Sequence, residues 1–258
     1  MNKILHSQIL GEGRPFIILH GFLGMGDNWK TLAKKFTELG YQMHLVDQRN
    51  HGRSFHDDSF SYKVMAEDLR VYYDHHKLEK GVLLGHSMGG KTAMEFATNY
   101  SEMVSHLVVA DIAPKAYPIH HQDILKALSS LDFSEIKTRG QADEVLSEYI
   151  KEVGTRLFLL KNLYWKEKGQ LGLRINLPVL SKKIAEVGIA LPVHRKYEGE
   201  TLFLRGDASN YIEDIDQLSI KNQFPKAGLE TIEKAGHWLH ADNPAMFLEI
   251  VLDFLKNI

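Results

Sequence analysis

The chain has 258 residues, of which 44% are hydrophobic and 25% charged, and it carries a formal net charge of −2 and no cysteine. This composition is typical of a large globular domain, and the balanced charge argues against nucleic acid or an anionic membrane surface as a partner. The lack of cysteine excludes disulfides, thiolate metal sites and a cysteine nucleophile, which favours serine chemistry.

The N-terminal segment and the apolar runs argue against export and membrane insertion. Residues 1–8 carry one lysine, and polar residues interrupt any apolar stretch well short of the roughly 7–15 residues of a signal peptide. Runs such as Phe16–Leu19 are far shorter than the roughly 20 residues that span a bilayer. We therefore expect a cytoplasmic protein without membrane insertion.

The first half of the chain alternates short aliphatic runs with longer amphipathic stretches, a pattern typical of parallel strands joined by crossover helices. It predicts a mostly parallel, doubly wound α/β sheet. The expected strands are 16–20, 42–47, 81–85 and 106–111, and the expected helices are 29–39, 62–78 and 87–100.

The pattern changes after Asp111. Residues 116–198 contain helical segments without convincing strands, and we interpret this block as a helical cap inserted into a core formed by residues 1–115 and 199–258. Helices are expected in the cap at 122–130, 141–153, 155–163 and 178–187; the core resumes with strands at 201–204 and 229–233, each followed by a helical pattern, the last at 244–257.

Gly85-His86-Ser87-Met88-Gly89 follows one predicted strand and begins a helix. This is the context of the nucleophile elbow of α/β-hydrolases, in which a strained serine is exposed at the carboxyl edge of the sheet. The glycines are needed because side chains two residues away on either side would collide with the strand or helix. Ser87 is therefore the predicted nucleophile.

His20-Gly21-Phe22-Leu23-Gly24 follows the first predicted strand. In folds with this elbow, the turn at that position supplies one backbone N–H of the oxyanion hole, and the residue after the nucleophile supplies the other. The sequence therefore predicts the amides of Phe22 and Met88 as the two donors.

His237 lies in a glycine-flanked loop between the strand predicted at 229–233 and the last helix. An imidazole there can reach over the sheet edge, accept the serine proton and return it to the leaving group. His240, three residues later, is the nearest rival, and we assign it at most a supporting role.

The acid of the triad must be a carboxylate that orients His237, and two positions fit the chain order of serine, acid and histidine. Asp111 ends a predicted strand. Asp207 follows a later strand, in a loop where many α/β-hydrolases keep their acid, but usually one or two residues further on, where this chain has Ser209 and Asn210. We favour Asp111 and keep Asp207 as the alternative.

The sequence resembles the YbfF-type esterases of the α/β-hydrolase superfamily, relatives of the abhydrolase-11 proteins. The resemblance lies in five motifs that extend almost from end to end: His20–Gly24, Asp47–Ser54, Gly85–Lys91, Asp111–Pro114 and Gly236–His240. It implies Ser87, Asp111 and His237 as the triad, and esterase or thioesterase activity on short to medium acyl chains.

Four further residues are predicted to bind substrate or to support the triad: His20, His86, Arg49 and Trp238. For the segment Asp47–Ser54 we favour a structural role, in which Arg49, Asn50 and His51 fix the neighbouring turns through buried hydrogen bonds. A role in polarising the substrate is the alternative.

No cofactor or metal is expected. The pairs His75-His76 and His120-His121 are interpreted as solvated, because adjacent helical residues point about 100° apart and no metal-binding spacing is present. The predicted partner is a small-molecule acyl ester, and the chain is expected to be a monomer or a homodimer.

These features predict a serine carboxylesterase that hydrolyses short- to medium-chain acyl esters through an acyl-enzyme on Ser87, with acyl thioesters as a further candidate substrate class. The serine at the elbow argues against haloalkane dehalogenases and epoxide hydrolases, which need a carboxylate there. Two alternatives stay open: a carbon–carbon bond hydrolase or perhydrolase on the same triad, and a hydrolase-like protein that binds a ligand without catalysis.

Overall fold

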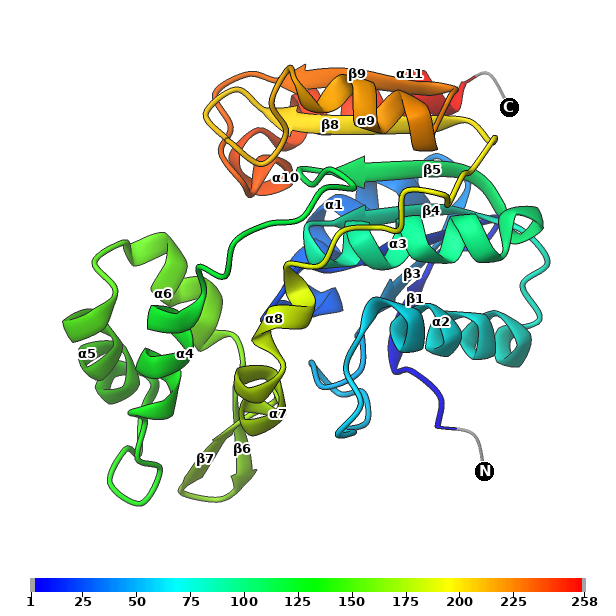
Figure 1. The fold of residues 1–258 in the computed structure, drawn as a ribbon. Helices are drawn as coiled ribbons and strands as arrows, with labels where there is room; N and C mark the ends of the chain where they lie inside the picture. Colours follow the sequence, from blue (N-terminus) through cyan, green and yellow to red (C-terminus); the bar gives the residue numbers. More distant parts are fainter. Residues whose placement is uncertain (1–2, 257–258) are drawn as a thin grey trace.

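The computed structural model describes residues 3–256, and its centre is a seven-stranded sheet (Figure 1). The strand order is β1-β3-β2-β4-β5-β8-β9, and every pairing is parallel except that of β1 with β3. The strands are β1 (Ser7–Leu10), β2 (Arg14–Leu19), β3 (Tyr41–Val46), β4 (Gly81–His86), β5 (Val104–Ala110), β8 (Thr201–Gly206) and β9 (Ala227–Ile232). The predicted doubly wound sheet is confirmed.

Helices cover both faces of the sheet, which is why its central strands are almost continuously apolar. Every residue of β4 is buried. One face packs against Trp29 of η1, Phe36 of α1 (Lys30–Thr37) and Phe247 of α11 (Pro244–Leu255). The other packs against α2 (Tyr62–His76), α3 (Met88–Asn99) and α9 (Asp216–Gln223). Short helices η1 (Gly26–Trp29), η2 (Ser101–Met103) and α10 (Leu239–Asp242) lie in the connections.

The chain between β5 and β8 forms the cap, which Figure 1 shows in green to yellow on one side of the core. Its helices are α4 (Gln122–Ser129), α5 (Arg139–Tyr149), α6 (Val153–Leu160), α7 (Leu177–Lys182) and α8 (Ile184–Val187). The expected helix at 178–187 is thus two short helices. The exact boundaries at residues 115/116 and 198/199 stay a prediction.

The expectation of a cap without strands was wrong. Strands β6 (Leu163–Glu167) and β7 (Gln170–Leu173) form an antiparallel hairpin. Gly169, with φ of 83°, makes the tight turn that a side chain would disfavour. The strands are short, and β6 begins at Leu163, inside the segment expected to be helical.

The structure also differs from the sequence prediction near each end of the chain. Strand β1 was not predicted, because it is short, only half-buried and at the sheet edge, so its sequence lacks a clear alternation. The helix expected at 244–257 ends at Leu255, and Asn257 lies outside the described residues. No helix within residues 3–256 combines the length and apolar character needed to cross a bilayer.

The cap and the core share one apolar cluster, which lies over the predicted oxyanion turn. Phe22, Leu23 and Met88 from the core pack in this cluster with cap side chains such as Leu159 and Leu160. The cap therefore packs against the turns that carry Phe22 and Met88, whose amides are the predicted oxyanion-hole donors.

Candidate active site

Ser87 lies at the sharp turn between β4 and α3, with φ of 53° and ψ of −118°. A Cβ on Gly85 would come within 2.2 Å of the Gly89 carbonyl oxygen, and one on Gly89 within 2.3 Å of the Leu19 carbonyl oxygen. These distances are too short for any side chain, so the turn requires both glycines. The Ser87 amide donates to the carbonyl of Ala110 at 2.9 Å, which ties the turn to β5.

His237 and Asp111 lie side by side, although 126 residues separate them in the chain. His237 Nδ1 is 2.7 Å from Asp111 Oδ2. Asp111 is fully buried and holds a positive φ of 51° directly after β5. Its carboxylate also accepts hydrogen bonds from the Ser209 hydroxyl at 2.5 Å and the Gly206 amide at 3.3 Å. The carboxylate is therefore held on several sides and directed at the imidazole.

Asp207 makes different contacts. Its exposed carboxylate accepts hydrogen bonds from the backbone amides of Lys234 at 2.9 Å and Ala235 at 3.0 Å. These bonds hold the pKa of Asp207 below its ordinary value. Asp207 thus fixes the start of the loop that carries His237, whereas Asp111 contacts the His237 ring.

Ser87 and His237 both line a cavity of about 450 Å³ between the core and the cap. Much of its wall is apolar and comes from Ile124, Leu157, Phe158 and Trp238. No hydrogen bond joins Ser87 Oγ to the His237 ring in the described part of the chain. Such bonds are often long without substrate and shorten in the complex.

The turn after β2 is held from both sides. Leu23, with φ of 60°, donates its amide hydrogen to His51 Nε2 at 3.2 Å, and its carbonyl accepts from Asn162 Nδ2 at 2.8 Å. The neighbouring amide of Phe22 and the amide of Met88 donate no hydrogen bond to another described residue. Both amides are thus available to a ligand near Ser87.

His20 lines the cavity, but both of its ring nitrogens are hydrogen-bonded to backbone groups. Its Nε2 accepts from the Gln48 amide at 3.0 Å, so its Nδ1 carries the hydrogen that the Gly21 carbonyl accepts at 2.8 Å. Burial lowers its pKa to about 4, which keeps the ring neutral. His20 therefore holds the turn that carries Phe22.

His86 and Trp238 contact the loop of His237 from two directions. His86 Nε2 donates to the carbonyl of His237 at 2.7 Å, which links β4 to that loop. Trp238 packs on the cap residue Phe158, with ring centroids 5.4 Å apart. Both residues line the cavity, as does His240, which stacks on Trp29.

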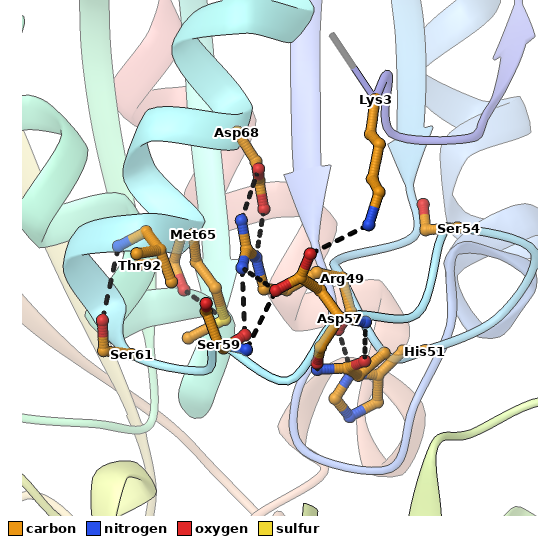
Figure 2. Close-up of polar contacts among 12 residues, drawn as sticks. Lys3, Arg49, His51, Ser54, Asp57, Ser59, Ser61, Met65, Asp68 and Thr92 are labelled. Carbon is orange, nitrogen blue, oxygen red and sulfur yellow. Dashed lines mark hydrogen bonds and ion pairs between the residues drawn. The ribbon is translucent and has the colours of Figure 1, made fainter. Parts of the chain in front are cut away.

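Arg49 does not line the cavity, and Figure 2 shows its side chain directed toward Asp68. Its guanidinium pairs with Asp68 of α2 at 2.5 and 2.7 Å and donates to the Ser59 carbonyl at 2.9 Å. Arg49 therefore fastens the loop after β3 to α2. Two other residues of this segment contact the turn after β2: His51 accepts from the Leu23 amide, and the Gln48 side chain donates to the His20 carbonyl at 2.7 Å. Asn50 accepts a hydrogen bond from Asn176 of the cap at 3.0 Å.

Two residues near the site, Tyr211 and Asn162, are not singled out by the sequence, and two others, Ser209 and His121, are named there without a role in the site. His121 lines the cavity, and burial lowers its pKa to about 4. The interpretation of His120-His121 as solvated fits His120, which is exposed, but not His121, which is half-buried. No group of three or more histidine, aspartate or glutamate side chains within residues 3–256 has the arrangement of a metal site.

Comparison with known proteins connects this geometry to a family. A family model described as the alpha/beta hydrolase fold matches residues 14–135. The sn-1-specific diacylglycerol lipase ABHD11 of Danio rerio is 36% identical over 253 residues, which cover 95% of this chain and 80% of the relative. The chain belongs to the α/β-hydrolase family.

Two further similar proteins support this family assignment. Esterase YbfF of Escherichia coli is 32% identical over 244 residues, covering 94% of this chain and 93% of the relative. The solved structure of a marine microorganism esterase is 44% identical, with a TM-score of 0.95, and the match covers 98% of this chain and 100% of that one. The predicted resemblance and fold class are confirmed, and this α/β-hydrolase is a carboxylic ester hydrolase. Oligomeric state and cellular location stay predictions.

Proposed function

We propose that this hydrolase cleaves short- to medium-chain acyl esters through an acyl-enzyme on Ser87, with His237 as general base and Asp111 as the acid. The observation that carries the proposal is the 2.7 Å contact between His237 Nδ1 and the buried carboxylate of Asp111, at a cavity that Ser87 also lines. A carboxylate on Nδ1 leaves Nε2 free to take up a proton.

The reaction follows from these positions. His237 removes the hydroxyl proton of Ser87 as the oxygen attacks the ester carbonyl, and Asp111 stabilises the imidazolium that forms. The imidazolium returns the proton to the leaving alcohol. A water molecule activated by His237 then hydrolyses the acyl-enzyme and restores Ser87.

The charge that develops on the carbonyl oxygen needs donors that are already in place. We assign this role to the free amides of Phe22 and Met88, and Met88 is also the first residue of α3, where the helix dipole favours negative charge. One such donor is worth about 100- to 1000-fold in rate. The hydrogen bonds that Leu23 donates to His51 and accepts from Asn162 support a rigid oxyanion turn.

The cavity supports an apolar acyl substrate of moderate size. It is about 450 Å³, and Leu157 and Phe158 of α6 form part of its apolar wall. The relative from Danio rerio is named a diacylglycerol lipase. We therefore include glycerol esters with the simple alkyl esters as candidate substrates, and acyl thioesters as a further class.

The test compares initial rates on p-nitrophenyl acetate, butyrate and octanoate, a short-chain diacylglycerol and an acyl thioester, for the parent chain and Ser87→Ala. Ester turnover by the parent alone is the expected result. Mass spectrometry after a fluorophosphonate probe should place the adduct on Ser87. A parent rate equal to that of Ser87→Ala on every ester would contradict the proposal and leave a ligand-binding protein as the better interpretation.

A further inference from the structure

We propose that Tyr211 is a positioning residue for His237, stabilising its protonated ring and linking its position to the first segment of the cap. The inference rests on the proposed function, because it concerns the imidazolium formed during catalysis. The rings of Tyr211 and His237 are stacked, with centroids 3.9 Å apart and an interplanar angle of 17°. The tyrosine ring thus covers one face of the imidazole, while the Asp111 carboxylate contacts Nδ1 at the edge of the same ring.

Tyr211 is itself held by several groups. Its amide donates to Ser209 Oγ at 3.3 Å, and its carbonyl accepts from the Tyr117 hydroxyl at 2.6 Å. The Tyr117 hydroxyl in turn accepts from the amide of Ala113 at 2.8 Å, and its ring stacks on that of Tyr211 at 5.4 Å. The stacked ring is therefore not free to swing away from His237.

The hydroxyl of Tyr211 reaches the segment that enters the cap. It lies 2.6 Å from His120 Nε2, while His120 Nδ1 lies 2.8 Å from the carbonyl of Pro118. A carbonyl can only accept, so Nδ1 carries the hydrogen and Nε2 of the neutral ring accepts from the tyrosine. Burial, together with the charge of Asp111, raises the pKa of Tyr211 to about 12, so the hydroxyl keeps the proton it donates.

The stabilisation of protonated His237 by Tyr211 also depends on the ionisable groups around the imidazole. Asp111 is the carboxylate that contacts the ring. The neighbouring histidines stay neutral, because burial lowers the pKa of His121 to about 4, that of His240 to about 3, and that of His86 well below its ordinary value. When His237 takes the proton, the face of the tyrosine ring attracts the new cation.

A cation over an aromatic face is stabilised by an amount equivalent to about 2- to 30-fold in an equilibrium or a rate. Because the neutral ring gains little from this attraction, the effect should appear in kcat and not in KM. The attraction should also favour protonation of His237. Removing the tyrosine ring should therefore move the acid limb of the pH–rate profile to lower pH. A residue that merely supports the fold would not move that limb.

The experiment measures kcat, KM and the pH dependence of kcat/KM on p-nitrophenyl butyrate for the parent, Tyr211→Phe, Tyr211→Leu and the half-exposed control Tyr149→Leu. Tyr211→Leu should lose about 2- to 30-fold in kcat with little change in KM, and its acid limb should move to lower pH. Tyr211→Phe keeps the aromatic face, so its acid limb should stay in place. Tyr149→Leu should match the parent.

Two results would overturn the inference: an acid limb of Tyr211→Leu that superposes on that of the parent, or a loss found only in KM. Thermal unfolding checks that each variant is folded, and Tyr211→Met, which also lacks an aromatic face, replaces the leucine variant if that one does not fold. Failure of the proposed function would look different, because the parent itself would then be no faster than Ser87→Ala.

Discussion

Asn162 Nδ2 donates a hydrogen bond to the carbonyl oxygen of Leu23 at 2.8 Å, joining the cap to the turn on which Phe22 lies. The two residues are 139 positions apart, and Asn162 is fully buried. Because Leu23 has a positive φ, its conformation depends on partners such as Asn162 and His51. The cap is therefore part of what shapes the proposed oxyanion hole, in addition to covering the cavity.

The first prediction concerns this contact. Asn162→Ala should lower kcat by about 10- to 100-fold with less than about a threefold change in KM, because a loosened turn misplaces the Phe22 amide in the transition state. Steady-state kinetics on p-nitrophenyl butyrate measure both constants. The exposed Asn210→Ala is the control, and a purely KM effect in Asn162→Ala would assign the residue to substrate binding.

Ser209 should contribute to stability through Asp111. Ser209→Ala removes a donor from a buried carboxylate, which should lower the free energy of unfolding by about 1–3 kcal/mol. Urea denaturation provides the measurement, with Ser134→Ala, at an exposed position, as the control. Ser209→Thr should retain most of the stability, since it keeps the hydroxyl. Equal unfolding free energies for Ser209→Ala and Ser134→Ala would contradict this account.

The buried histidines predict how stability depends on pH. The pKa is lowered from 6.5 to about 4 for His20 and to about 3 for His51, in both cases because burial disfavours the charged ring. Between pH 6.5 and about 4 the unfolded chain therefore binds more protons than the folded one, so stability should fall as the pH falls. Each group contributes a slope of about 1.4 kcal/mol per pH unit in this window.

Urea denaturation at pH 7.5, 6.5, 5.5 and 4.5 tests this dependence. We expect nearly constant stability between pH 7.5 and 6.5 as far as these two groups are concerned, and a steep decline below. An unfolding free energy that stays level down to pH 4.5 would show that these rings are not held neutral by the fold.

The glycines of the elbow, Gly85 and Gly89, should not tolerate substitution by alanine. Gly85→Ala should prevent folding or lower stability by several kcal/mol, because its Cβ would lie 2.2 Å from a backbone oxygen that has no room to move. Gly140→Ala in α5 is the matched control: its Cβ meets only Thr138 Oγ1 at 3.8 Å, and it should raise stability by about 0.5–1 kcal/mol. Thermal unfolding compares the two, and a Gly85→Ala chain as stable as the parent would be inconsistent with the turn described.

Local signals explain what the sequence could predict. Ser87 is identified by flanking glycines between a strand and a helix, and His237 and Asp111 by their places at strand ends, so chain order and the fold class bring them to one sheet edge. The same reasoning kept Asp207 open, because both carboxylates end strands of that edge. Only the three-dimensional contacts separate them: Asp207 bonds to backbone amides and Asp111 to the His237 ring.

What the sequence missed depends on contacts between distant segments. Asn162 and Tyr211 have no motif of their own, and their positions become meaningful only once the cap is folded against the core. For Arg49 the favoured structural role agrees with its contact to Asp68 of α2, but the sequence alone does not identify that partner. The β6–β7 hairpin escaped notice because its strands are short and partly exposed, so their pattern does not differ clearly from that of a cap helix.

The most direct test of the account is the initial rate on p-nitrophenyl butyrate for the parent, Ser87→Ala, Asp111→Asn and Asp207→Asn. The account predicts a loss on the order of a million-fold for Ser87→Ala and on the order of ten-thousand-fold for Asp111→Asn, with Asp207→Asn within about tenfold of the parent. A parent-like rate for Asp111→Asn, or a collapse of activity in Asp207→Asn alone, would contradict the proposed triad.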